Sequence, residues 1–138
     1  MKVTETVQIN AGATKVWETL KSFQNPEQYI PAVQSSTVNG SGQGATRTCQ
    51  VLMGDQSFAV NETLQEVDES RKSLVISLDH APPPMQGLQF QYVVNTAEQS
   101  SALEISTEIP ENPEMEQMIR GLFSMMGQGI KQFHEQTD

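Results

Sequence analysis

The chain has 138 residues, the usual size of one domain. It carries 17 acidic and 8 basic side chains, a formal net charge of −9 at pH 7, which argues against nucleic acid or an anionic membrane as the main partner. The single cysteine, Cys49, excludes an internal disulfide, and the short apolar runs predict no membrane-inserted segment. The polar N-terminus is unlike a signal peptide. We therefore expect one cytoplasmic domain over residues 1–138.

The spacing of apolar side chains along the sequence changes at residues 10–12. Residues 3–9 alternate with period two, which predicts a strand. Apolar side chains then recur every three or four positions up to Phe23, which predicts a short amphipathic helix with Trp17 as its anchor against a sheet. Asn25 and Pro26 end it, and residues 26–30 are expected to form one further helical turn.

The middle of the chain, residues 33–109, is a series of alternating segments separated by turn residues. Turns are predicted at residues 40–44, 54–55, 68–70, 81–84 and 95–100. Each intervening segment has one apolar and one polar face. Strands of this kind predict an antiparallel sheet that is covered on one side only.

The cover is predicted to be a helix over residues 113–136, with Asn112 as its cap and Pro113 at its first position. Its apolar side chains fall in an arc of roughly 160°: Met115, Met118, Ile119, Leu122, Phe123, Met125, Met126, Ile130 and Phe133. The expected fold is α+β: a seven-stranded curved antiparallel sheet around a long C-terminal helix, with two short helices between the first two strands.

Three motifs in this order resemble a known family. The segment VQINAGATKVW (residues 7–17) is similar to the opening of START-like SRPBCC proteins, GATR (44–47) to their Gly-x-x-Arg strand start, and NETL (61–64) to their Glu-x-Leu. The polyketide cyclase/dehydrase branch resembles the chain most, and the abscisic-acid receptors more distantly. The resemblance implies a helix-grip fold that encloses a cavity for an apolar or amphipathic ligand.

The chain also departs from that family. Gly12 stands where the family usually has proline, and Gly87-Leu88 replaces an aromatic residue after the proline-containing loop. The loop at residues 53–57 lacks the proline-containing gate of the hormone receptors. A hormone-receptor mechanism is therefore not expected.

Glu62 is the most informative side chain, because it shares strand parity with apolar neighbours and should point into the core. A buried carboxylate needs a partner. A turn at residues 54–55 brings Arg47 close to it with the same inward parity. We predict an Arg47–Glu62 pair that is either a polar anchor for a ligand or a structural ion pair at the sheet margin.

The predicted cavity lies between the sheet and the last helix. Methionines on that helix suit an adaptable apolar lining, although plain core packing explains each of them as well. Gly129 removes a side chain within the apolar arc and would leave space there, although close approach of a strand is an equal explanation. The expected ligand-binding residues are Arg47, Glu62, Val60, Leu78, Phe90, Tyr92, Met118, Leu122, Met126 and Gly129.

No catalytic residue, metal site or cofactor is predicted. Cys49 would need an adjacent base to act as a nucleophile, and neither His80 nor His134 is placed beside it by the pattern. A buried, inert thiol is the better interpretation of Cys49. His80 and Asp79 lack a third metal ligand.

Three functions remain open. The first is binding or carriage of a small hydrophobic or amphipathic molecule, lipid- or polyketide-like. The second is a cyclase/dehydratase, a lyase-type enzyme that would depend on Glu62 with Arg47 and Tyr92. The third is a protein-interaction domain with a filled core, and a protein partner or a homodimer also stays open. A cavity above roughly 300 Å³ would favour the first two.

Overall fold

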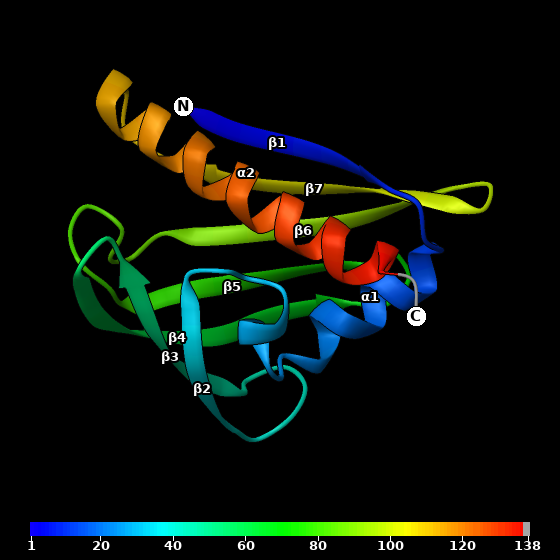
Figure 1. Cartoon of the computed structure of the whole chain (residues 1–138), viewed down its shortest axis with the longest axis horizontal. Coiled ribbons are helices and arrows are strands. Elements are labelled where there is room, and N and C mark those ends of the chain that lie inside the picture. The colour runs from blue at the N-terminus through cyan, green and yellow to red at the C-terminus, as the bar shows by residue number, and fades with distance from the viewer. Residues whose placement is uncertain (137–138) are drawn as a thin grey trace.

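The computed structural model describes residues 1–136, so the last two residues of the predicted domain lie outside it. Seven strands form one antiparallel sheet in the order β1-β7-β6-β5-β4-β3-β2 (Figure 1). Their bounds are Lys2–Ile9 for β1, Val33–Asn39 for β2, Thr46–Met53 for β3, Gln56–Asp68 for β4, Ser73–His80 for β5, Gln89–Ala97 for β6 and Ser100–Glu108 for β7. The predicted helix-grip architecture is confirmed.

Two short helical elements connect β1 to β2, as predicted. Helix α1 (Ala13–Ser22) buries its apolar face, and the 3-10 turn η1 (Pro26–Gln28) follows it. Trp17 is 2% exposed, and its indole nitrogen donates a hydrogen bond to Glu69 at 2.8 Å. This contact fastens α1 to the β4–β5 turn, so Glu69 is more than the solvated turn residue that its sequence position suggests.

The long helix α2 (Pro113–Glu135) lies across the inner face of the sheet, alongside β1 and β7 (Figure 1). The Asn112 side chain accepts hydrogen bonds from the backbone nitrogens of Glu114 and Met115, which confirms the predicted cap. Ile119, Phe123 and Ile130 are completely buried. Part of the predicted apolar arc is not core, since Met118 is 38% exposed.

One predicted turn is shorter than expected. The polar segment 95–100 is mostly strand, since β6 continues to Ala97 and Asn95 pairs with Ala102 of β7. Polar side chains on the outer face of a sheet do not interrupt the backbone ladder, so composition alone places this boundary too early.

The strand that carries Glu62 is irregular. β4 is 13 residues long and has register shifts against β5 between Asn61 and Glu62 and between Leu64 and Glu66. Such bulges bend a strand and increase its twist. One of the two shifts falls directly beside Glu62.

A candidate ligand-binding cavity

A cavity of about 430 Å³ lies between α2 and the half of the sheet formed by β3 to β6. The strands contribute alternate, inward-facing side chains, and the segment between η1 and β2 closes one flank. The lining residues are Ile30, Ala32, Val33, Arg47, Cys49, Val51, Met53, Phe58, Val60, Glu62, Leu78, Met85, Phe90, Tyr92, Gln117, Met118, Gly121, Leu122, Met125 and Met126. Apolar side chains dominate this wall, as in small-molecule sites in general.

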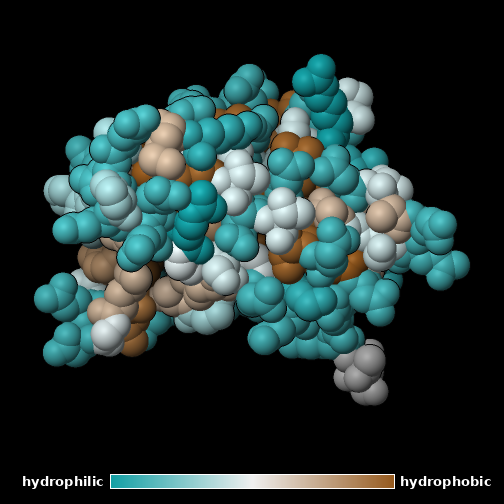
Figure 2. Space-filling model, turned by 90° about the horizontal axis from the view of Figure 1, so that it is seen from above, coloured by the Kyte–Doolittle hydropathy of each residue, from teal (hydrophilic) through white to brown (hydrophobic). Residues whose placement is uncertain are grey.

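The cavity opens where its lining is exposed. Met53 at the tip of the β3–β4 hairpin is 50% exposed, and Gln117, Met118 and Gly121 on α2 are also exposed. The β3–β4 hairpin, the β5–β6 loop that carries Met85 and the N-terminal half of α2 all lie towards the left of Figure 1 and contribute to the cavity lining. Figure 2 shows apolar groups reaching the surface at this end, among mostly hydrophilic ones. The mouth is therefore apolar and flanked by methionines.

The polar group of the cavity is the predicted pair. Arg47 and Glu62 are direct partners in the β3–β4 register, and the Arg47 Nε lies 2.8 Å from the Glu62 Oε1. The side chain of Arg47 is 3% exposed and that of Glu62 is 12% exposed. The sheet thus brings a nearly desolvated ion pair into an otherwise apolar wall.

Arg47 has a second partner that the sequence did not reveal. Its Nη1 donates a hydrogen bond to the Phe23 carbonyl at 3.2 Å, and its guanidinium carbon lies 4.1 Å from the centre of the Phe23 ring. Phe23 ends α1 in the left-handed conformation, at φ 63°. Arg47 therefore joins the end of α1 to the sheet. No local pattern predicts this contact, because 24 residues separate the two side chains.

Two further polar groups line the same wall. The Cys49 thiol lies 3.4 Å from the Glu62 Oε1 and donates to it. Burial and the neighbouring carboxylate raise the pKa of Cys49 to about 12. Burial, followed by the charge of Glu62, also raises the pKa of the Tyr92 phenol above its ordinary value. Both groups keep their protons at neutral pH.

Nine of the ten residues expected to bind a ligand line this cavity. Their positions follow from strand parity and from the helical arc, the two patterns used to choose them. Whether they contact a ligand stays a prediction.

Gly129 is the exception, and the expectation that it leaves empty space is wrong. A methyl group at this position would overlap the Tyr29 carbonyl oxygen and crowd Pro31. The small residue is needed because backbone approaches α2 closely here. The approaching segment is the one after η1 and not, as expected, a strand. It brings Ile30 and Val33 against the cavity.

The glycine that does leave space is Gly121, which the sequence analysis overlooked. It lines the cavity near its mouth, and a methyl group there would meet no atom within 4 Å. Gly121 lies just outside the predicted apolar arc, so periodicity gave no reason to choose it.

The histidines lie apart from this wall. Neither His80 nor His134 is among the residues that line the cavity. The His134 Nε2 is buried and has no hydrogen-bond partner among the described residues, and burial, followed by the charge of Lys15, lowers the pKa of this imidazole. Within residues 1–136, no group of three or more His, Cys, Asp or Glu side chains is arranged to hold a metal ion.

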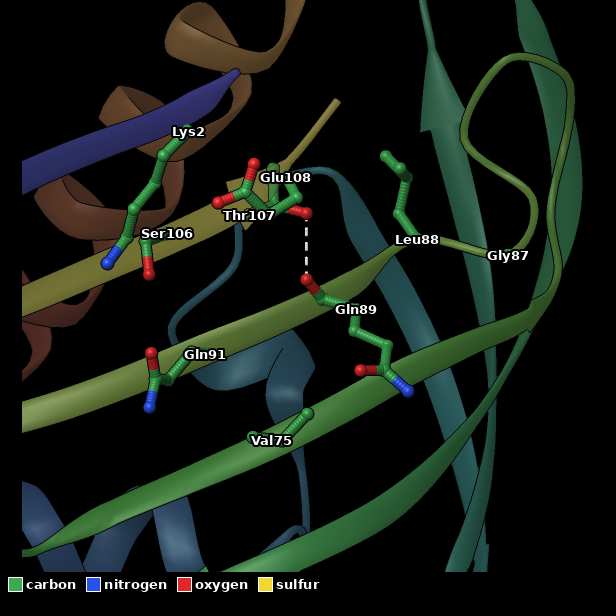
Figure 3. Close-up of a pocket in the computed structure, with 9 residues that line it drawn as sticks. All are labelled: Lys2, Val75, Gly87, Leu88, Gln89, Gln91, Ser106, Thr107 and Glu108. Atoms are coloured by element: carbon green, nitrogen blue, oxygen red, sulfur yellow. Dashed lines mark hydrogen bonds between the residues drawn. The ribbon is translucent and has the colours of Figure 1, made fainter. Parts of the chain in front are cut away.

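A second concavity, of about 460 Å³, lies on the outer face of the sheet (Figure 3). Its residues include Lys2, Gln91 and Glu108, and the hydrogen bond drawn there runs from the Thr107 hydroxyl to the Gln89 carbonyl at 2.7 Å. It combines mixed polar groups with an open outer surface. The inner cavity, with its apolar wall and buried ion pair, is the better candidate site.

Comparison with known proteins agrees with this geometry. Residues 1–135 match the family described as "Polyketide cyclase / dehydrase and lipid transport". The chain belongs to this family. The resemblance to START-like SRPBCC proteins is thereby confirmed, and membership supports a domain that binds hydrophobic ligands. Within residues 1–136, no helix combines the length and hydropathy needed to cross a bilayer.

Solved structures share this fold at low sequence identity. A protein of Nitrosospira multiformis is 15% identical with a TM-score of 0.79, and the match covers 98% of this chain and 97% of that one. The protein XoxI of Bacillus cereus is 18% identical with a TM-score of 0.80, over 96% and 94% of the two chains. Ara h 8.0201 is 14% identical with a TM-score of 0.74, over 96% of each chain. No curated protein matched the sequence.

Proposed function

We propose that this member of the family binds and carries a small hydrophobic or amphipathic molecule, lipid- or polyketide-like, in the cavity between the sheet and α2, and that it does so as a single cytoplasmic domain. The observation that carries the proposal is the cavity itself. Its volume of about 430 Å³ lies within the range of small-molecule sites, and its apolar wall holds one ion pair.

The alternative of an interaction domain with a filled core is less well supported. A filled core would have no space between Leu122 and Tyr92, whereas both residues line the cavity. An exposed methionine at the mouth also suits entry of an apolar ligand.

The alternative of a cyclase/dehydratase needs an acid–base group inside the cavity. Cys49 and Tyr92 keep their protons at neutral pH, because both pKa values are raised. Glu62 is the carboxylate that would have to serve as base. Its Oε1 accepts from Arg47 and Cys49, its Oε2 has no donor among the described residues, and no histidine lines the cavity to relay a proton. The polar wall therefore favours holding a ligand over transferring protons.

Binding of the neutral fluorophore N-phenyl-1-naphthylamine tests this proposal. We expect saturable binding at one site in the wild-type protein. Gly121→Leu should fill space near the mouth and weaken binding by about tenfold, equivalent to about 1.4 kcal/mol. Ser124→Leu adds the same side chain at an exposed position of α2 outside the cavity lining and should leave binding unchanged.

Native mass spectrometry of freshly purified protein supplies an independent measurement. We expect a co-purified apolar molecule that is released on unfolding. A protein without such a mass, and without saturable fluorophore binding, would contradict the carrier function and favour the interaction domain.

A further inference from the structure

Two of the three guanidinium nitrogens of Arg47, the positive group of the cavity, are already bound by the protein. Arg47 donates through Nε to Glu62 and through Nη1 to the Phe23 carbonyl, and its guanidinium lies against the Phe23 ring. With its side chain 3% exposed, Arg47 presents little surface to a ligand. An incoming carboxylate would have to displace an existing buried ion pair.

Glu62, the negatively charged member of the ion pair, is more exposed than Arg47. The side chain of Glu62 is 12% exposed, four times the fraction of Arg47. Its Oε1 accepts from Arg47 and Cys49, whereas no group among the described residues donates to its Oε2. A carboxylate oxygen without a donor can accept a hydrogen bond from a ligand.

Tyr92 adds a second group on this wall. It is 4% exposed and lines the cavity, and its hydroxyl forms no hydrogen bond among the described residues. A neutral phenol can both donate and accept. Together, Glu62 and Tyr92 offer two acceptors and one donor to whatever occupies the cavity.

The geometry points to selection by this cavity of neutral, hydroxyl-bearing apolar molecules over carboxylates of the same chain length. This inference rests on the proposed function and specifies its ligand class. A ligand hydroxyl can donate to the Glu62 Oε2 or accept from Tyr92 without bringing a charge into the cavity. A ligand carboxylate would place a second negative charge beside Glu62 in a poorly solvated wall. The net charge of −9 disfavours anions further.

Displacement of N-phenyl-1-naphthylamine by three ligands that share a ten-carbon chain tests the inference on the wild-type protein. Decan-1-ol is neutral and carries a donor, methyl decanoate is neutral and only accepts, and decanoate is an anion at neutral pH. We expect decan-1-ol to compete at about tenfold lower concentration than decanoate, with methyl decanoate between them. The middle ligand separates the contribution of the donor from that of the charge.

A variant at Glu62 tests whether its carboxylate charge causes the preference for decan-1-ol over decanoate. Glu62→Gln removes the carboxylate charge beside the ligand and should shift the ratio of decanoate to decan-1-ol affinities towards decanoate by about tenfold. Glu66→Gln makes the same charge change four residues away at an exposed position and should leave the ratio unchanged. The wild-type ligand series decides the inference even where Glu62→Gln does not fold.

The outcomes separate the inference from the function on which it rests. Decanoate that competes as well as decan-1-ol would overturn the selectivity and leave the carrier function intact. A protein that binds neither the fluorophore nor any of the three ligands would overturn both.

Discussion

The two sides of α2 differ although they are made of similar residues. On the side towards β1 and β7, Ile119, Phe123 and Ile130 have no exposed surface. On the side towards β3 to β6, Met118 and Leu122 are next to them in sequence, yet both border the cavity and Met118 is 38% exposed. Hydrophobicity decides that both sides face inward, and the path of the sheet decides which side is packed.

The glycines of α2 repeat this contrast. Gly127 and Gly129 are buried where backbone or the Val7 side chain approaches the helix, whereas Gly121 faces open space. Glycine thus has two roles on one helix: it permits close contact near the C-terminal end and keeps volume free near the cavity mouth.

The largest expected loss of stability comes from a substitution on the packed side of α2. Phe123→Ala should lower the free energy of unfolding by about 3–5 kcal/mol, because it leaves a hole beside the Phe90 ring, whose centre is 5.0 Å away. Leu122→Ala should cost less than about 2 kcal/mol, because that side chain already borders empty space. Urea unfolding of both variants measures the difference. Equal losses would mean that the cavity side is packed as tightly as the other.

Alanine substitutions at Gly129 and Gly121 should change the stability in opposite directions. Gly129→Ala should destabilise by about 1–3 kcal/mol, since the added methyl overlaps the Tyr29 carbonyl oxygen. Gly121→Ala should stabilise by up to about 1 kcal/mol, since alanine favours the helix and nothing lies within 4 Å of the new carbon. Thermal unfolding checks both. A tolerated Gly129→Ala would contradict the close approach of the segment after η1.

The smallest expected change in stability concerns the Cys49 thiol in the cavity wall and depends on pH. Because the folded-state pKa of Cys49 is raised from 9.0 to about 12, its contribution to stability is complete below pH 9 and is lost as pH rises towards 12. Between about pH 8 and about pH 10, the wild-type protein should lose about 1 kcal/mol more than Cys49→Ala. Groups common to both proteins cancel in this difference. Identical pH profiles would mean that the thiol is solvated.

Much of the candidate site followed from local patterns. Strand parity placed Val60, Glu62 and Leu78 on the inner face, and the hairpin at residues 54–55 set Arg47 directly opposite Glu62. Contacts between distant segments did not follow. The Phe23 ring under Arg47 and the Tyr29 carbonyl against Gly129 join residues far apart in the chain, and no periodicity records such neighbours.

By itself, the sequence determined which elements form and which faces are apolar, because turn residues and periods of two or 3.6 act within a few residues. It therefore sufficed for seven strands, a capped long helix and an inward Arg47–Glu62 pair. Only the tertiary structure decided where the apolar faces meet. The position of α2 over β1 and β7 leaves a cavity against the rest of that face, and the backbone after η1 occupies the space expected at Gly129. Packed core and cavity wall are made of the same side chains, and the distance between the layers distinguishes them.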